Sequence, residues 1–249
     1  MSDLSDKINY QDLARWDIVQ ESAPLLNNGY FIDVNTHKIT CNDGYGWDTP
    51  WIYLGSRKNK EVENCRQRKL TFDTFGTFPG GCLDCWKVFI KPITVRGLFN
   101  TYDVLCRLDY PGKCGIDLRD YTPHTYLGVV YCRGREQGDE RYETVRAEIT
   151  KELGKDTEVF LKPYCTELQQ KFGSSYQRKD LTEDDLGWDE LVKKHFDLME
   201  GQLNPPQIVK NHVMRFWLAW AWADEDKSAM VYNDGKPLTE PQRHQKKGE

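Results

Sequence analysis

Cys82 and Cys85 form a C-x-x-C pair that directly precedes an apolar run at residues 86–92. Two cysteines separated by two residues can occupy half of a tetrahedral zinc shell without strain. Cys41 and Cys65, which lie upstream, supply the two further thiolates that a closed shell needs. We therefore predict a structural zinc ion held by these four cysteines. The alternative is that some of them are buried thiols, which pack as small apolar side chains.

The position of the C-x-x-C pair disfavours a redox role. Redox-active pairs lie at the start of a helix that follows a strand, where the helix dipole lowers the pKa of a thiol. This pair instead precedes a strand-like run. The other four cysteines of the chain are expected to pack in the core; they are Cys106, Cys114, Cys132 and Cys165.

The chain has 249 residues and a formal net charge of −5, which excludes the strongly basic class of non-specific nucleic-acid coat proteins. Its first residues carry acidic groups rather than an apolar run, and no apolar stretch reaches the roughly eighteen residues of a membrane span. We therefore expect a cytoplasmic protein with reduced thiols and no membrane contact. The sequence has no motif of a serine hydrolase, a P-loop, a dinucleotide-binding loop or a zinc protease, which makes an enzyme the less favoured class.

Six segments between residues 86 and 165 carry the clearest secondary-structure pattern. Strand-like runs alternate with segments of helical periodicity, and Thr94 is placed to cap the first helix. The predicted elements are a strand at 86–92, a helix from 95, strands at 113–118 and 125–132, a helix near 137–153 and a strand at 158–162. This is the order of a ferredoxin-like module, in which two helices cover one face of a four-stranded antiparallel sheet. The expected fold class is therefore α+β.

Shorter elements are expected on both sides of this module. Residues 42–81 show no sustained periodicity, so a metal ion is a plausible organiser of that segment. The flanking elements are a helix at 9–20, strands at 30–34 and 38–41, and helices at 166–173, 186–199 and 207–223, the last apolar on nearly all sides. The predicted divisions are a helix, hairpin and cysteine-rich metal-binding segment (1–85), the ferredoxin-like module (86–165), a helical extension (166–224) and a mobile tail (225–249).

Two strand sequences resemble those of RNA-recognition modules, which share the ferredoxin-like order. Residues 88–93, Val-Phe-Ile-Lys-Pro-Ile, resemble the first-strand motif of that family, and residues 126–131, Tyr-Leu-Gly-Val-Val-Tyr, are loosely similar to the third-strand motif. The resemblance implies that Phe89 and Tyr126 stack on unpaired bases. The chain departs from the motif at Gly128, where a second ring is usual, and before residue 126, where His-Thr replaces a Lys/Arg-Gly pair. Strands that bind no ligand also alternate in this way, so both interpretations stay open.

Two basic segments lie among aromatic residues between positions 51 and 78. This mixture is typical of single-stranded nucleic-acid binding, since cations neutralise phosphates and ring faces stack on bases. A solvated loop that Glu61 and Glu63 partly neutralise is the alternative. The basic residues are Arg57, Lys58, Lys60, Arg66, Arg68 and Lys69.

The chain as a whole joins a cysteine-rich aromatic lead-in, the run Cys-x-x-Cys-Trp-Lys, an α/β module and a helical end. In this combination it resembles uncharacterised phage-encoded proteins. The resemblance implies an accessory or inhibitor protein that acts by binding a host or viral macromolecule.

Our leading hypothesis is a non-enzymatic, zinc-stabilised protein that binds a protein partner or a second copy of itself. The tryptophans expected at that interface are Trp217, Trp220 and Trp222. One alternative is a protein that binds single-stranded RNA or DNA through the basic aromatic loop and the sheet rings. A second is a metal-dependent nuclease or other hydrolase, in which Asp117 and Glu158 face one another near Lys162.

Overall fold

The computed structural model describes the backbone of residues 30–32 and 39–41 and, in full, residues 49–55, 72, 78–120, 122, 125–172, 180–183, 185–187, 190 and 205–232. The strands are β1 (Tyr30–Ile32), β2 (Ile39–Cys41), β3 (Trp51–Leu54), β4 (Cys85–Lys91), β5 (Gly112–Ile116), β6 (Tyr126–Arg133) and β7 (Glu158–Pro163). The helices are η4 (Gly80–Cys82), α4 (Val95–Leu108), α5 (Gly134–Leu153), α6 (Thr166–Phe172), α8 (Gln207–Ala223) and η5 (Lys227–Tyr232).

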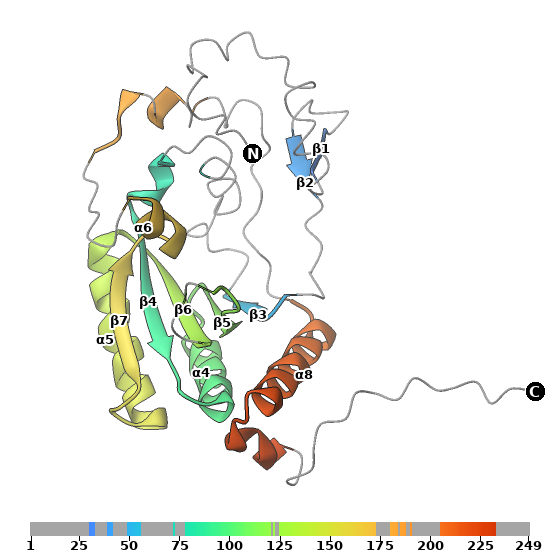
Figure 1. Cartoon of the computed structure of the whole chain (residues 1–249). Helices are drawn as coiled ribbons and strands as arrows, with labels where there is room; N and C mark the ends of the chain where they lie inside the picture. The colour runs from blue at the N-terminus through green and yellow to red at the C-terminus, as the bar shows by residue number, and fades with distance from the viewer. Residues whose placement is uncertain are drawn as a thin grey trace, which may run out of the picture.

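Five strands form one antiparallel sheet in the order β3-β5-β6-β4-β7, which Figure 1 shows face on. Strand β6 is the middle strand, between β5 and β4, and every pair of neighbours is antiparallel. The predicted succession of strand, helix, strand, strand, helix and strand from residue 86 is confirmed. The predicted pairing of two short strands near residues 30 and 40 is confirmed as well, since β1 pairs with β2.

Strand β3 is a correction to the sequence analysis, which expected no regular structure between residues 42 and 81. It pairs with β5 and buries Ile52 and Leu54. Pro50 and Gly55 flank the strand, so four residues carry the whole pattern, too few for a periodicity to stand out. Pairing with β5, which is distant in the sequence, stabilises the strand. The sequence of β3 alone does not indicate that pairing.

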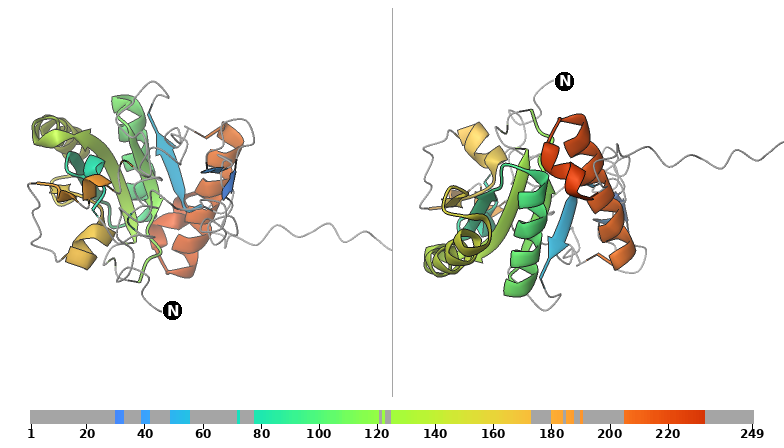
Figure 2. Two further views of the ribbon diagram at one scale, coloured as in Figure 1. Left: turned by 90° about the horizontal axis from the view of Figure 1, so that it is seen from above. Right: turned by 90° about the horizontal axis from the view of Figure 1, so that it is seen from below.

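Helices α4, α5 and α8 cover one face of the sheet (Figure 2). The core there joins helix residues such as Leu98 and Ile149 to strand residues such as Val88 and Ile90, all of them fully buried. The predicted cap of α4 is confirmed, because the Thr94 hydroxyl accepts a hydrogen bond from the backbone N–H of Gly97 at 3.1 Å. We call this side of the sheet the helix-covered face.

Helix α8 forms where it was predicted and buries one stripe rather than its whole circumference. The buried residues recur every fourth position and are Val209, Val213, Trp217 and Ala221. Trp217 lies in the core against Phe99 and Tyr102, and its indole N–H donates to the carbonyl of Pro50 at 2.8 Å. This bond ties α8 to the start of β3.

The chain continues after α8 into a packed segment, whereas a mobile tail was predicted to begin at residue 225. The Asp226 carboxylate accepts hydrogen bonds from the N–H of Val95 at 2.6 Å and from the hydroxyl of Tyr126 at 3.1 Å. Element η5 follows, with Ala229 buried and Tyr232 against Phe99. Asp226 thus satisfies a backbone donor in the first turn of α4.

Some predicted elements fall outside the described residues. The helix at 9–20 lies outside them, and so does most of the helix predicted at 186–199. Helix α6 confirms the helix predicted at 166–173.

Candidate functional site

The second face of the sheet carries a different set of side chains from the helix-covered face. Because successive residues of a strand point to opposite faces, every second residue of β3 to β7 lies here. Many of these positions hold an aromatic ring or a lysine. We call this the lysine–aromatic face and define it by Trp51, Lys87, Phe89, Lys91, Lys113, Tyr131, Phe160 and Lys162.

A small apolar cluster forms the centre of the lysine–aromatic face. Phe89, Leu127 and Val129 are buried, and the partly buried rings of Trp51, Tyr131 and Phe160 pack around them. Phe89 lies directly opposite Phe160 across β4 and β7, with ring centroids 5.3 Å apart and planes 15° apart. All six residues come from strands, so among the described residues this cluster is built by the sheet itself.

Each aromatic ring that defines the lysine–aromatic face has a lysine ammonium group over it. Lys113 Nζ is 3.7 Å from the Trp51 ring centroid, and Lys91 Nζ is 4.5 Å from that of Phe160. The other two pairs, with Nζ to centroid distances of 4.8 Å and 5.7 Å, are Lys162 with Phe89 and Lys87 with Tyr131. Cation–π attraction favours these placements. The rings and the charges therefore form one mixed surface rather than separate patches.

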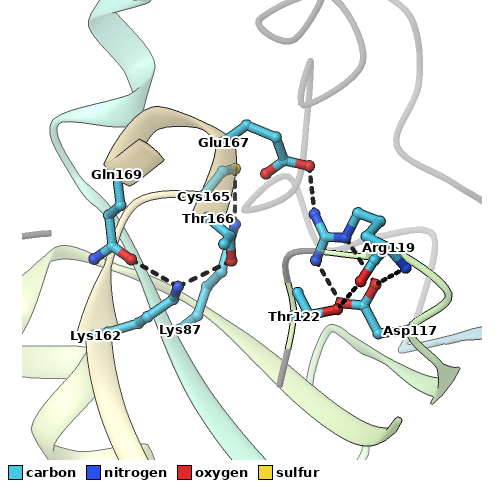
Figure 3. Close-up of polar contacts among 9 residues, drawn as sticks. All are labelled: Lys87, Asp117, Arg119, Thr122, Lys162, Cys165, Thr166, Glu167 and Gln169. Carbon is cyan, nitrogen blue, oxygen red and sulfur yellow. Dashed lines mark hydrogen bonds and ion pairs between the residues drawn. The ribbon is translucent and has the colours of Figure 1, made fainter. Parts of the chain in front are cut away.

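Lys87 and Lys162 are direct partners across β4 and β7. Like charges at such positions destabilise a sheet. The Lys162 ammonium donates to neutral acceptors on α6, the Thr166 hydroxyl at 3.0 Å and the Gln169 carboxamide oxygen at 2.9 Å (Figure 3). Burial, and then repulsion by Lys87, lowers the pKa of Lys162 to about 8. The fold thus holds two amines together at a cost to its own stability.

Cys165 lies between β7 and α6, and its Sγ is 2.9 Å from the Nζ of Lys87. Lys87 is buried, with 6% of its surface exposed, and Cys165 is half-buried. Figure 3 shows the thiol and the two lysines at the junction of β7 and α6. Cys165 also packs against the buried cluster around Phe78, so its predicted core packing is confirmed in part. Cys114 and Cys132 are buried as predicted, whereas Cys106 is exposed, which corrects the prediction for that residue.

An arginine joins the loop after β5 to α6. Arg119 donates to Asp117 at 2.7 Å and 2.5 Å and to Glu167 at 2.5 Å. Burial by itself would raise the pKa of both carboxyl groups. The hydrogen bonds and charge of Arg119 outweigh burial at Asp117 and lower its pKa, while the Glu167 backbone N–H and Arg119 do the same for Glu167. Asp117 and Glu167 therefore remain ionised and hold Arg119 between the loop after β5 and helix α6.

Phe89 and Tyr126, which the resemblance to RNA-recognition modules implies as base-stacking rings, lie on opposite faces of the sheet. This arrangement corrects that expectation. Phe89 belongs to the lysine–aromatic face, whereas Tyr126 lies under the helices with its hydroxyl on Asp226. Gly128, where the motif has a second ring, also faces the helices, and a Cβ there would lie 2.6 Å from Thr101 of α4. The ring on β6 that shares the face with Phe89 is Tyr131.

Sequence reasoning missed most of this surface. A signal is present in two similar five-residue runs, Lys-Val-Phe-Ile-Lys on β4 and Glu-Val-Phe-Leu-Lys on β7. In each run the first, third and fifth residues are a charged residue, a phenylalanine and a lysine. Each run looks like an ordinary strand in isolation. Their pairing places the charges and rings side by side, and a single local pattern does not report which strands pair.

The structure does not bring together the carboxylates of the hydrolase hypothesis. Asp117 follows β5, whereas Glu158 opens β7, and two strands lie between them. Glu158 is exposed and pairs with Lys91 at 3.0 Å. The described part of the chain therefore offers no support for a two-carboxylate metal site at these residues.

The predicted zinc ligands are described in part. Cys82 packs with Phe78, Tyr164 and Leu168, and Cys85 opens β4. The side chains of Cys41 and Cys65 lie outside the described residues, as do the basic residues predicted between 57 and 69. Within the described ranges no group of three or more His, Cys, Asp or Glu side chains could hold a metal ion, and the four-cysteine site stays a prediction.

The three tryptophans predicted at a protein interface do not form one surface. Trp217 is fully buried, Trp222 is half-buried and Trp220 is 37% exposed. Trp220 instead lies near Phe216, at 6.4 Å between ring centroids. The exposed rings of α8 are therefore Phe216 and Trp220.

No protein-family model, curated protein or solved structure matches the chain. None of the helices in the described segments is long and apolar enough to cross a bilayer. Function is therefore inferred from the geometry and charge of the two sheet faces.

Proposed function

We propose that this chain is a non-enzymatic protein that binds single-stranded nucleic acid on the lysine–aromatic face. One observation carries the proposal: four rings and four lysines interleave on one side of a single sheet. Single-stranded nucleic acids need such a mixture, because bases stack on rings while ammonium groups neutralise the phosphates between them.

The half-buried rings Trp51, Tyr131 and Phe160 are the proposed stacking positions. In the free protein an ammonium group lies over each ring. A base that stacks on a ring displaces this cation, and the freed ammonium group then pairs with a neighbouring phosphate. The lysines thereby keep the rings covered without a ligand and contribute charge when a ligand binds.

We also propose that strands β4 to β7 form a ferredoxin-like module of the RNA-recognition type. The strand order β5-β6-β4-β7 supports this, because it places β4 and β6 at the centre. RNA-recognition modules stack bases on the two central strands, and here Tyr131 is the half-buried ring on one of them, while Phe89 on the other is buried and stacks on Phe160. The resemblance to phage-encoded proteins suggests a host or viral nucleic acid as the ligand.

Fluorescence anisotropy with labelled single-stranded oligonucleotides tests the proposal. Affinity should fall linearly in a double-logarithmic plot against salt concentration, because binding releases counterions. Lys113→Ala should weaken binding and flatten this slope by about 0.7. Lys151→Ala is the matched control, since it removes an exposed lysine from α5 on the other side of the sheet.

Two results would contradict the proposal. One is the absence of binding to DNA and RNA strands of all four bases at low salt. The other is an equal loss of affinity in Lys113→Ala and Lys151→Ala, which would indicate general attraction to lysines rather than a defined face.

A second candidate function, contact with a protein partner or a second copy, is favoured by the outer side of α8. Ile208, Phe216 and Trp220 recur at multiples of four residues and are 66%, 38% and 37% exposed. Apolar contacts of this kind resist salt, unlike phosphate contacts. Light scattering of the wild type and of Trp220→Ser over a concentration series tests self-association, and a salt-insensitive dimer lost in Trp220→Ser would support it. A chain that stays monomeric at high concentration would exclude self-association through α8.

The predicted zinc ion is proposed as a support for the segment before β4. Native mass spectrometry of untagged protein should show one zinc, and chelation should lower the melting temperature. Cys85→Ser should lose the metal, whereas Cys106→Ser, at an exposed thiol of α4, should retain it. Metal-free wild-type protein with an unchanged melting temperature after chelation would exclude the site.

A further inference from the structure

The thiol of Cys165 and the amine of Lys87 lie within hydrogen-bond distance of each other. Their Sγ and Nζ atoms are 2.9 Å apart, and the pair joins the start of α6 to the central strand β4. We propose that these residues form a peroxide-reactive pair, in which oxidised Cys165 is captured by Lys87 as a reversible sulfur–nitrogen cross-link. This inference is independent of the proposed nucleic-acid binding.

The charges around Cys165 favour its reactive form. A thiolate is the nucleophile in attack on peroxide, and nearby cations stabilise it. Lys87 contacts the sulfur directly, and Lys162, the cross-strand partner of Lys87, interacts electrostatically with the same thiol. Glu167 interacts electrostatically with both lysines, and Arg119 pairs with Glu167 at 2.5 Å. Cys165 is also half-buried rather than fully enclosed.

The chemistry balances with peroxide as the oxidant. The thiolate sulfur attacks one peroxide oxygen, the O–O bond breaks, and the second oxygen leaves as water after protonation. This step gives a sulfenic acid, which condenses with nitrogen nucleophiles. The Lys87 amine, after loss of its ammonium proton, then attacks the sulfur, so that an S–N bond forms, the S–O bond breaks and a second water leaves. In total one thiol, one amine and one peroxide give one sulfenamide and two waters.

Other cysteines of the described region provide internal controls. Cys114 and Cys132 are buried among apolar residues, and burial raises the pKa of Cys114, which keeps it a thiol. Cys106 on α4 is exposed and therefore more accessible to peroxide than Cys165. Exposure would make Cys106 the first to react, whereas charge stabilisation would make Cys165 the first.

The test treats reduced wild-type protein with hydrogen peroxide, blocks remaining thiols and follows each cysteine by peptide mass spectrometry. Cys165 should be consumed on the order of tenfold faster than Cys106. The main product should be a peptide pair joined between Cys165 and Lys87, lighter by two hydrogens than the two free peptides, and dithiothreitol should release it. Lys87→Met should lose the cross-link and slow the oxidation of Cys165.

Two results would overturn the inference. Oxidation of Cys106 as fast as that of Cys165 would show that exposure controls reactivity. Rapid conversion of Cys165 to sulfinic acid with no Lys87-linked peptide would show that the amine does not capture the sulfur. Both measurements use the wild-type chain, so neither depends on whether Lys87→Met folds.

Discussion

The two faces of the sheet come from the same strands and differ in nearly every physical property. The helix-covered face presents Val88 and Ile90 to the helices, and both side chains are fully buried. The two neighbours of Val88 on the same strand, Lys87 and Phe89, belong to the lysine–aromatic face. A single alternation therefore produces one face that is buried under helices and another that carries lysines and rings.

The two faces differ in the unfavourable interactions that they contain. On the helix-covered face, buried polar groups form hydrogen bonds within the protein; for example, the Trp217 indole N–H donates to the Pro50 carbonyl. The lysine–aromatic face instead holds Lys87 and Lys162 directly opposite each other. Proteins keep such locally unfavourable arrangements mainly at functional sites, so the contrast can be tested by measuring stability and binding separately on each face.

The largest effect is expected on the helix-covered face. Trp217→Ala removes a fully buried ring and its hydrogen bond to Pro50, and should lower the free energy of unfolding by about 3 to 5 kcal/mol. Urea denaturation measures this loss. Trp220→Ala, at an exposed ring of the same helix, should cost less than about 1 kcal/mol; similar losses in both variants would show that α8 is not anchored through Trp217.

The next effect concerns binding on the lysine–aromatic face. Phe160→Leu keeps an apolar side chain at the rim of the cluster but removes the ring that stacks on Phe89. The free energy of binding to a single-stranded oligonucleotide should weaken by about 1 to 3 kcal/mol, as measured by fluorescence anisotropy. Phe216→Leu removes an exposed ring from α8 and should leave affinity unchanged. A larger loss in Phe216→Leu would place the binding surface on α8.

A smaller effect is expected at the carboxylate that joins the C-terminal segment to α4. Asp226→Ala removes the acceptor for the Val95 N–H and the Tyr126 hydroxyl, and should cost about 1 to 2 kcal/mol. Burial would raise the pKa of Asp226, but these hydrogen bonds, with those from Ser228, lower it.

Since the folded pKa of Asp226 lies below the unfolded value, its stabilisation is complete above about pH 4 and is lost as the pH falls through the folded pKa. Denaturation curves at several acidic pH values should therefore converge for wild type and Asp226→Ala. Asp224→Ala, at an exposed carboxylate two residues earlier, is the control. A difference between wild type and Asp226→Ala that does not shrink with acid would contradict the assignment.

The smallest effect has the opposite sign. Lys162→Met removes one member of the like-charged pair and should stabilise the free protein by roughly 0.5 to 1 kcal/mol at neutral pH. The same change should weaken nucleic-acid binding. Lys91→Met, which breaks the ion pair with Glu158, should give no such gain.

The pH dependence sharpens this test. The pKa of Lys162 is lowered from 10.5 to about 8, so its destabilising charge is fully present below pH 8 and is relieved as the pH rises toward 10.5. Wild-type stability should gain a contribution across this window that Lys162→Met lacks. Identical profiles for the two proteins would show that the pair carries no strain.

Local patterns predicted the elements that local physics stabilises. The strands and helices from residue 86 were predicted in order, and so were the capping hydroxyl of Thr94 and the helix at 207–223. Strand β3 was missed, because four residues depend on pairing with β5 for their conformation. The half-exposed outer side of α8 was missed as well. Composition shows that a helix is apolar, but it does not show how much of the helix surface packs against other elements.

The sequence determined the alternation of charge and ring on β4 and β7, since period-two spacing is a property of neighbouring residues. The tertiary structure decided which faces these residues share. It opposed Phe89 to Phe160 and Lys87 to Lys162, and it placed Tyr126 under the helices instead of beside Phe89. Strand register depends on contacts between residues far apart in the chain, and a shift of one position would exchange the two faces of a strand. For this reason the chemistry of the lysine–aromatic face emerges only once the sheet is assembled.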